Sequence, residues 1–213
     1  MTELKQEIDL FLRRSFLDPF KRRLVINSKL IQYEKKSIPC SEIRQVRYGI
    51  LQMYINGIKA NRIYEIGLTT NNFKPIRITF QSSRIFFKNE KLENTYNDII
   101  ECLWNQVTKR LVTEAIENLE KGKTFSMEKI EVHPKGIQMQ VRSWLFKKNI
   151  YFVEWKDVRK YSQDGLLCIY SEQNKKAKIN LNYQKDWNTP VLSSLLDYLW
   201  ENGRAYALSE DRF

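Results

Sequence analysis

Two short stretches decide the fold: Ile99-Ile100-Glu101-Cys102-Leu103-Trp104 and, in the second half of the chain, Leu195-Leu196-Asp197-Tyr198-Leu199-Trp200. In each stretch two adjacent apolar residues are followed, one helical turn later, by a Leu-Trp pair. This spacing places a broad apolar stripe on one side of a helix. A large indole at the end of such a stripe can fill the mouth of a curved sheet. The sequence therefore predicts two helices of the same kind, each closing a sheet.

Two further matches between the halves precede these helices. Residues Ile26–Gln32 parallel Val132–Gln138, and residues Ile38–Arg44 parallel Val153–Arg159. All four segments lie among apolar residues that recur with a period of two, which is typical of strands. Each half thus has several strands followed by one helix, and this common order indicates an internal duplication. The spacing between the matches differs, as insertions in loops would require.

Three segments follow from this pattern. Residues 1–20 are predicted to form an N-terminal amphipathic helix, ended by Asp18-Pro19, because apolar residues recur there at helical spacing: Leu4, Ile8, Phe11, Leu12 and Phe16. Residues 21–122 form a first domain, whose long C-terminal helix covers about residues 94–121. At 1.5 Å per residue this helix could reach about 40 Å and link two domains. Residues 123–213 form the second domain.

The segment Val153–Val158, with Trp155 and Asp157, resembles the strand pattern "apolar, any, Trp, any, Asp, apolar" of bacterial pleckstrin-homology-like domains. Gly136-Ile137 and Leu199-Trp200 are similar to further positions of that family. In the first half, Cys40 and Glu42 stand at the Trp and Asp positions. The resemblance implies an α+β, mainly β fold with two bent antiparallel sheets or barrels, each capped by a C-terminal helix. It also implies binding of lipid headgroups or proteins rather than catalysis.

The amino-acid composition argues against several classes of functional site. The 213 residues carry a net charge of +11, with one histidine and three cysteines. These counts and spacings are unlike those of a histidine-rich metal site, a zinc knuckle or a disulfide scaffold. No glycine-rich phosphate loop or nucleophile elbow occurs, and we expect neither catalytic residues nor a cofactor. The single histidine, His133, could act as a base, but its place beside Pro134 favours a turn residue.

The positive charge is concentrated in the first half of the chain. Residues 1–90 hold 17 basic and 8 acidic side chains, a net of +9. Such a surface attracts phosphate on lipid headgroups or nucleic acid, although solvated faces of many proteins carry similar clusters. The candidate binding residues in this half are Arg13, Arg14, Lys21, Arg22, Arg23, Lys35 and Lys36.

An aromatic and basic loop in the second half is the other candidate surface. It lies between two predicted strands, where polar turn residues are expected. An exposed loop of this composition suits an anionic membrane or a protein partner. The alternative is that the loop folds back and buries its aromatic side chains within the protein. The candidate binding residues are Arg142, Trp144, Leu145, Phe146, Lys147 and Lys148.

The function predicted from these features is that of a non-catalytic adaptor, which docks to a protein partner, an anionic phospholipid surface, or both. The alternative is a nucleic-acid-binding protein, because tyrosines are interleaved with the basic residues of the first half and could stack on bases. A third reading is an enzyme with an unfamiliar site. The N-terminus does not resemble a secretory signal and no apolar run approaches the ~18 residues of a membrane-spanning helix. We therefore expect a cytoplasmic protein, in some conditions peripheral to the inner face of the membrane.

Overall fold

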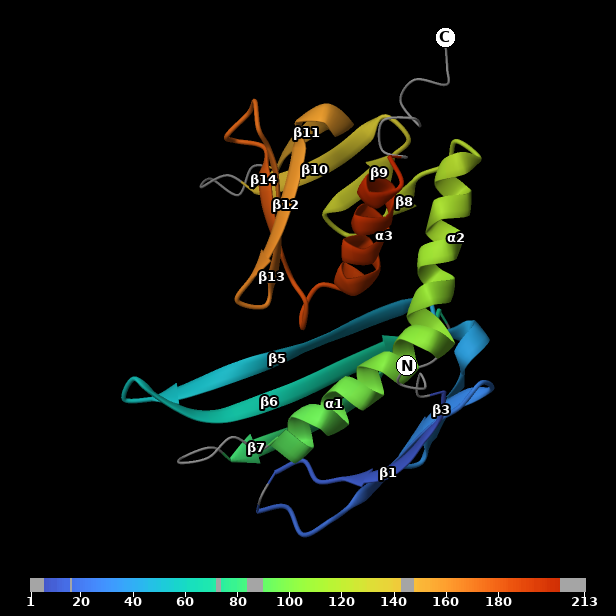
Figure 1. The fold of residues 1–213 in the computed structure, drawn as a ribbon, viewed down its shortest axis with the longest axis vertical. Coiled ribbons are helices and arrows are strands. Elements are labelled where there is room, and N and C mark those ends of the chain that lie inside the picture. The colour runs from blue at the N-terminus through green and yellow to red at the C-terminus, as the bar shows by residue number, and fades with distance from the viewer. Residues whose placement is uncertain (1–5, 16, 72–73, 84–89, 143–147, 204–213) are drawn as a thin grey trace. The chain divides into compact units, whose positions relative to one another are not determined.

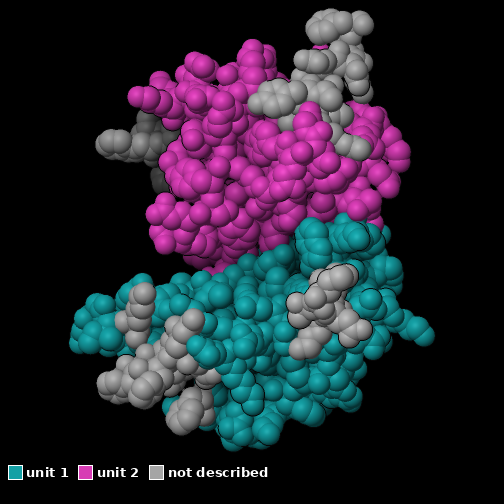
Figure 2. All heavy atoms as spheres, in the orientation of Figure 1, with its two compact units in different colours: residues 1–110 teal, residues 111–213 magenta. Residues whose placement is uncertain are grey.

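A computed structural model describes residues 6–15, 17–71, 74–83, 90–142 and 148–203. The chain divides into two compact units, Met1–Arg110 and Leu111–Phe213, which are coloured separately in Figure 2. In both units antiparallel strands dominate and a helix follows them (Figure 1). The predicted mainly β class is therefore confirmed.

Unit 1 contains two antiparallel sheets. The first is a meander in the order β1-β2-β3-β4, and the second has the order β5-β6-β7. A single turn of 3-10 helix, η1 (Cys40–Glu42), joins the two sheets. A helical stretch follows β7: α1 (Glu90–Leu103), a π-helical turn η2 (Trp104–Thr108) and α2 (Lys109–Glu120), which continues into unit 2. The strands are β1 (Ile8–Leu12), β2 (Arg22–Ile26), β3 (Leu30–Tyr33), β4 (Lys36–Pro39), β5 (Gln45–Ile55), β6 (Ile58–Thr69) and β7 (Ile76–Ser83).

Unit 2 repeats this order. A four-stranded sheet, β11-β10-β9-β8, is followed by the 3-10 turn η3 (Trp155–Asp157), a three-stranded sheet β12-β13-β14, and the helix α3 (Thr189–Glu201). The two 3-10 turns, η1 and η3, fall on the predicted match between residues 38–44 and 153–159. The strands are β8 (Phe125–Ser126), β9 (Ile130–His133), β10 (Gly136–Arg142), β11 (Lys148–Glu154), β12 (Val158–Gln163), β13 (Leu166–Ser171) and β14 (Lys178–Asn182).

The predicted N-terminal helix is wrong. Residues Ile8–Leu12 form strand β1, which pairs antiparallel with β2 from Ile8 opposite Ile26 to Leu12 opposite Arg22. Ile8 and Leu12 are buried and four residues apart, a spacing that fits one face of either a helix or a strand. The segment adopts the strand, because pairing with β2 gives hydrogen-bond partners to backbone groups that would otherwise be unpaired at the edge of the sheet.

The expectation of barrels is also wrong. Within the described residues each unit holds two separate antiparallel sheets rather than one closed barrel. The 3-10 turns η1 and η3 interrupt the strand pairing where the chain passes from the first sheet to the second. A short non-extended turn breaks the hydrogen-bond ladder, so the strands before it and the strands after it belong to separate sheets.

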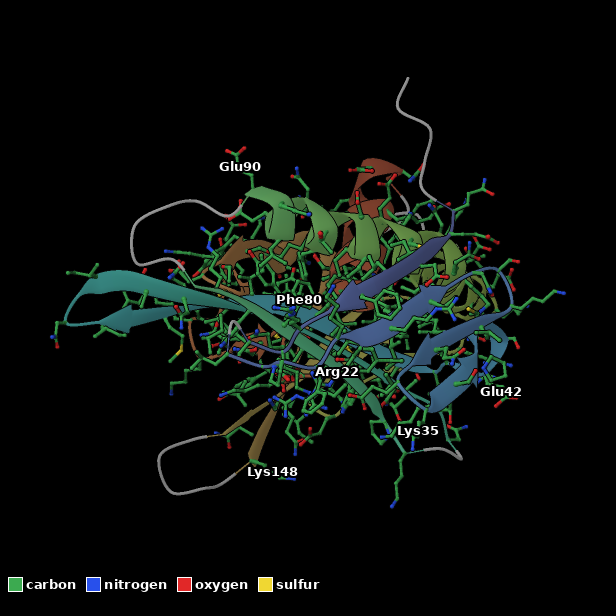
Figure 3. The ribbon with its side chains drawn as sticks, turned by 90° about the horizontal axis from the view of Figure 1, so that it is seen from below. Arg22, Lys35, Glu42, Phe80, Glu90 and Lys148 are labelled. Carbon is green, nitrogen blue, oxygen red and sulfur yellow. The ribbon has the colours of Figure 1, made fainter. Side chains whose placement is uncertain are left out.

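The core of unit 1 is aromatic beneath α1. Tyr64 of β6 stacks on Phe80 of β7 with ring centroids 4.9 Å apart, and Tyr96 of α1 lies 5.1 Å from the Tyr64 ring. Phe80 is labelled in Figure 3 within the side chains packed beneath α1. At the start of α2, the Arg110 guanidinium donates to the backbone oxygens of Cys40 and Ile43, at 3.1 and 2.6 Å.

The core of unit 2 is centred on a buried tryptophan. The Trp155 indole is 1% exposed and donates through Nε1 to the backbone oxygen of Pro134 at 2.7 Å. Trp200 of α3 meets it edge to face, with ring centroids 6.1 Å apart. Leucines of α3 complete this core: Leu192, Leu195, Leu196 and Leu199. A helix therefore packs against the 3-10 turn of each unit, through Arg110 in unit 1 and through Trp200 in unit 2.

Candidate functional site

The aromatic and basic loop lies largely outside the described residues. Trp144, Leu145, Phe146 and Lys147 fall in the gap between 142 and 148. Arg142 ends β10 and Lys148 begins β11, and the two residues are paired in the ladder. Lys148 is exposed. A role of this loop in binding therefore stays a prediction.

Three of the predicted basic residues of unit 1 are held in ion pairs. The Arg22 side chain pairs with Asp18 and with Glu34, both within 2.6 Å, and Arg14 lies 3.3 Å from Glu34. Arg23 donates two hydrogen bonds to Asp9 across the β1–β2 pair. These arginines serve first to fix the connection between β1 and β2. Arg22 and Lys35 are marked in Figure 3.

Acidic partners in these pairs are more acidic than usual. The Phe20 amide and the Arg22 guanidinium donate hydrogen bonds to Asp18, and both lower the pKa of its carboxyl group. The hydrogen bond from Arg23 likewise lowers the pKa of Asp9. Both carboxylates therefore remain charged at any physiological pH and neutralise their arginines, which leaves less positive charge for a ligand.

A first hollow, of about 430 Å³, combines cations with an acid. Arg14, Lys36 and Arg77 line it together with Glu34 and the ring of Tyr33. Each cation already has a partner within the protein, because Lys36 donates to the Pro75 oxygen at 3.3 Å and Arg77 lies 2.7 Å from Glu65. Of the binding residues predicted from the sequence, Arg14 and Lys36 both line this first hollow.

A second hollow, which we call the basic hollow, has a different character. It measures about 500 Å³ and lies between the end of β1, the end of β7 and the first turns of α1. Arg13, Lys21 and Lys91 line it, and none of its described lining residues is acidic. The structure shows no ion pair between these three cations and any described residue. Their charge is therefore available to a ligand.

A buried serine borders this hollow. Ser82 continues the inward-facing series of β7 after Ile78 and Phe80, is 1% exposed, and lines the basic hollow. Its Oγ has no hydrogen-bond partner among the described residues. Buried polar groups nearly always have a partner, so an unpartnered hydroxyl group in the wall of the hollow is unusual. Its surroundings combine hydrogen-bond donors with positive charge, and this combination suits a phosphate.

The sequence predicted only part of the basic hollow. Arg13 and Lys21 were among the candidates, whereas Ser82 and Lys91 were not. Both missed residues flank the connection between β7 and α1, about 60–80 residues after Arg13 and Lys21 in the sequence. No short-range signal links the two regions, since only the packing of α1 and β7 beside β1 brings them together.

An exposed apolar hairpin was missed altogether. The β5–β6 hairpin turns at Asn56-Gly57 and reaches beyond the residues of β6 that pair with β7, as Figure 1 shows. We call residues 50–58 the apolar arm, because six of its large side chains are at least 40% exposed: Ile50, Leu51, Met53, Tyr54, Ile55 and Ile58. An Asn-Gly turn flanked by an almost unbroken apolar run was the available signal.

The single histidine lies at the end of a strand and not in the turn where the sequence placed it. His133 is the last residue of β9, and the turn begins at Pro134. Its ring packs against Phe152 edge to face, and its Nε2 lies 3.4 Å from Glu131. In the part of the chain that the structure describes, no three His, Cys, Asp or Glu side chains gather where they could hold a metal ion.

Comparisons with known proteins add no family. No protein-family model matches the chain, and a search of curated proteins finds no significant match. Among the helices of the described residues, none combines the length and the apolar composition needed to cross a bilayer.

Proposed function

We propose that this protein is a non-catalytic adaptor built from two pleckstrin-homology-like domains, and that unit 1 binds the phosphate of anionic phospholipid headgroups in the basic hollow. The repeated order of four strands, a 3-10 turn, three strands and a helix supports the family assignment. The proposed place of action is the cytoplasmic face of a membrane.

The basic hollow is the observation that carries the proposal. Phosphate oxygens accept short, charge-assisted hydrogen bonds from arginine and lysine, and Arg13, Lys21 and Lys91 offer these without competing carboxylates. The exposed Lys35 and Lys36 add positive charge on the same unit. Each lysine or arginine close to an anionic leaflet contributes about 1 kcal/mol of attraction.

Buried tyrosines weigh against the nucleic-acid alternative. That reading needs aromatic rings on the surface, where bases can stack. Four tyrosines are interleaved with the basic residues of the first half of the chain. Of these, Tyr33 and Tyr64 are buried, Tyr48 is half-buried, and only Tyr54 is well exposed. A headgroup in the basic hollow needs no aromatic platform, so the described surface favours phosphate over bases.

Vesicle co-sedimentation tests the proposal. The full chain is expected to bind vesicles of equal parts phosphatidylcholine and phosphatidylglycerol but not vesicles of phosphatidylcholine alone. The double variant Lys21→Glu, Lys91→Glu should bind at least about tenfold more weakly, since two attractive charges become repulsive. Inorganic phosphate should compete with the vesicles.

The matched control is Lys175→Glu, Lys176→Glu. It makes the same change in net charge at two exposed lysines of unit 2. An equal loss of binding in the control would show that the overall positive field, and not the basic hollow, holds the membrane. Absence of binding to either vesicle would overturn the proposed function. A gel shift with DNA or RNA that outcompetes the vesicles would favour the alternative.

A further inference from the structure

The apolar arm extends further than the fold requires, and unit 2 provides the comparison. Its β12–β13 hairpin occupies the same place in the order of elements and turns at Asp164-Gly165. Both hairpins have positive φ at the two turn residues: 49° and 79° at Asn56-Gly57, 51° and 75° at Asp164-Gly165. Positive φ at both positions defines the same tight hairpin turn. The turns are therefore alike, and the strands that lead to them are not.

Strand length and chemistry separate the two hairpins. Strands β5 and β6 have 11 and 12 residues, against 6 and 6 for β12 and β13. The three residues before the turn are Met53-Tyr54-Ile55 in unit 1 and Tyr161-Ser162-Gln163 in unit 2. Since unit 2 folds with a short and polar hairpin tip, the apolar tip of unit 1 is not needed for closing the domain. Its exposed apolar area calls for another explanation.

The exposed side chains of the arm lie on both of its faces. Successive residues of a strand point to opposite sides, so Ile50 and Leu51 expose opposite faces, as do Tyr54 and Ile55. At the tip, Ile55 pairs with Ile58, both more than 60% exposed. A groove on a folded partner would cover one face of a ribbon and leave the other in water. A bilayer surrounds an inserted tip on all sides.

Charge along the hairpin is basic in sequence and partly neutralised in the fold. From residue 43 to residue 64 the sequence contains four basic residues and no acidic one: Arg44, Arg47, Lys59 and Arg62. Arg47 pairs with Glu65 and Arg62 pairs with Glu93, so these two arginines contribute little net charge. Anionic headgroups are attracted to basic residues that border an apolar segment, and in unit 1 the basic hollow supplies most of that attraction.

We infer that the apolar arm inserts into the boundary between headgroups and acyl chains of an anionic membrane. From the Gln52–Arg62 pair to the turn, four residues at 3.3 Å each give a reach of about 13 Å. Amphipathic elements at a membrane surface bury their apolar side by about 5–10 Å, so the tip is long enough. Tyr54 suits the headgroup level. This inference rests on the proposed function, since the basic hollow brings the domain to the same surface.

A fluorescent label on the tip measures insertion directly. Ile58→Cys, labelled with an environment-sensitive dye, is compared with Ile150→Cys labelled in the same way. The two isoleucines are 66% and 63% exposed, in strands of different units. The native Cys40, Cys102 and Cys168 are buried, so labelling is selective. On vesicles with brominated acyl chains, the dye at position 58 should shift to the blue and be quenched, and the dye at position 150 should not.

Substitution by a charge tests the contribution of the arm to binding. Ile55→Asp should weaken binding to phosphatidylcholine–phosphatidylglycerol vesicles at least about tenfold, because a buried apolar side chain becomes charged. Ile150→Asp should change it less than about twofold. Far-UV circular dichroism and the urea midpoint check that both variants are folded.

The outcomes separate this inference from the proposed function. Vesicle binding by the wild type with no quenching at position 58 overturns insertion and leaves the basic hollow in place. Equal losses for Ile55→Asp and Ile150→Asp also overturn it. Sedimentation of the wild type as a dimer that Ile55→Asp makes monomeric, without loss of vesicle binding, shows that a second copy covers the arm. No vesicle binding at all overturns both proposals.

Discussion

Replacing Trp155 with phenylalanine should selectively destabilise unit 2. The indole is fully buried, donates to the Pro134 oxygen at 2.7 Å and meets the Trp200 ring edge to face. Phenylalanine is smaller and has no N–H group, so the variant loses a hydrogen bond, part of an aromatic contact and some packed volume. The 3-10 turn η3 would then lose its anchor to the β9–β10 turn.

The magnitude follows from these three losses. The hydrogen bond contributes about 1 kcal/mol and the aromatic contact about 0.5–1 kcal/mol. Removing part of a buried indole costs about 1–2 kcal/mol, less than the 3–5 kcal/mol of truncation to alanine. The expected loss is therefore about 2.5–4 kcal/mol. With a urea m value of about 2 kcal/mol/M, the unfolding midpoint should fall by about 1–2 M.

Urea unfolding followed by tryptophan fluorescence is the assay. Four of the five tryptophans belong to unit 2, so this signal reports mainly on that unit. Trp200→Phe is the matched control: Trp200 is half-buried, and the change should cost less than about 1 kcal/mol. A fall of less than about 0.3 M for Trp155→Phe, or an equal fall for both variants, would refute the reasoning that Trp155 anchors the unit.

The remaining predictions concern a close backbone contact at Gly136, the hydrogen bonds of Arg110, the titration of Tyr96 and the reactivity of the cysteines. Gly136→Ala should destabilise unit 2 by about 1–3 kcal/mol in urea, because an added Cβ would lie 2.2 Å from the Val153 oxygen; an unchanged midpoint contradicts this. Arg110→Met should lower the midpoint of unit 1 by a similar amount, since two carbonyl oxygens beside η1 lose their donor; loss in unit 2 alone would contradict it. Burial raises the pKa of Tyr96, so as the pH rises the hydroxyl group loses its proton in the unfolded state before it does so in the folded state. The free energy of unfolding should therefore fall above about pH 10, the ordinary pKa of tyrosine. Tyr96→Phe should reduce this alkaline loss, as measured by urea titrations at increasing pH. The native protein should not react with a thiol reagent until it is denatured, and rapid reaction of one equivalent would show an accessible thiol among Cys40, Cys102 and Cys168.

Much of the fold could be predicted because periodicity and turn signals are local. The polar residues Asn27-Ser28-Lys29 predict a hairpin turn, and β2 and β3 do turn there; Gly203 predicts a helix end, and α3 ends at Glu201. The strand β1 could not be predicted in the same way, since Ile8 and Leu12 fit either a helix or a strand. Only the free edge of β2, which lies outside that window of sequence, selects the strand.

The candidate site was less accessible to sequence reasoning. Basic residues are easy to find, but a sequence does not show which of them are neutralised. Arg22 and Arg23 were candidates, but Arg22 is paired with Asp18 in the β1–β2 connection and Arg23 with Asp9 of β1. Lys91 was not predicted as a binding residue, because it lies at the start of a helical stretch with more acidic than basic residues. Packing nevertheless places it beside Arg13 and Lys21 in the basic hollow. Availability of charge is therefore a property of the fold and not of composition.

The two units close in the same place with different chemistry, and this difference bears on function. In unit 2 the 3-10 turn is held by the contact between the Trp155 and Trp200 rings, and binding of a membrane or a partner does not require this contact to be exposed. In unit 1 the corresponding position is Cys40, and the helix instead reaches the turn through Arg110. The basic hollow and the apolar arm both belong to unit 1, whose sequence also carries most of the net positive charge. Variants of unit 1 surfaces should therefore change membrane binding without changing stability, and variants of the unit 2 core should do the reverse. A core variant such as Trp155→Phe that abolished vesicle binding while unit 1 remained folded would contradict this division of roles.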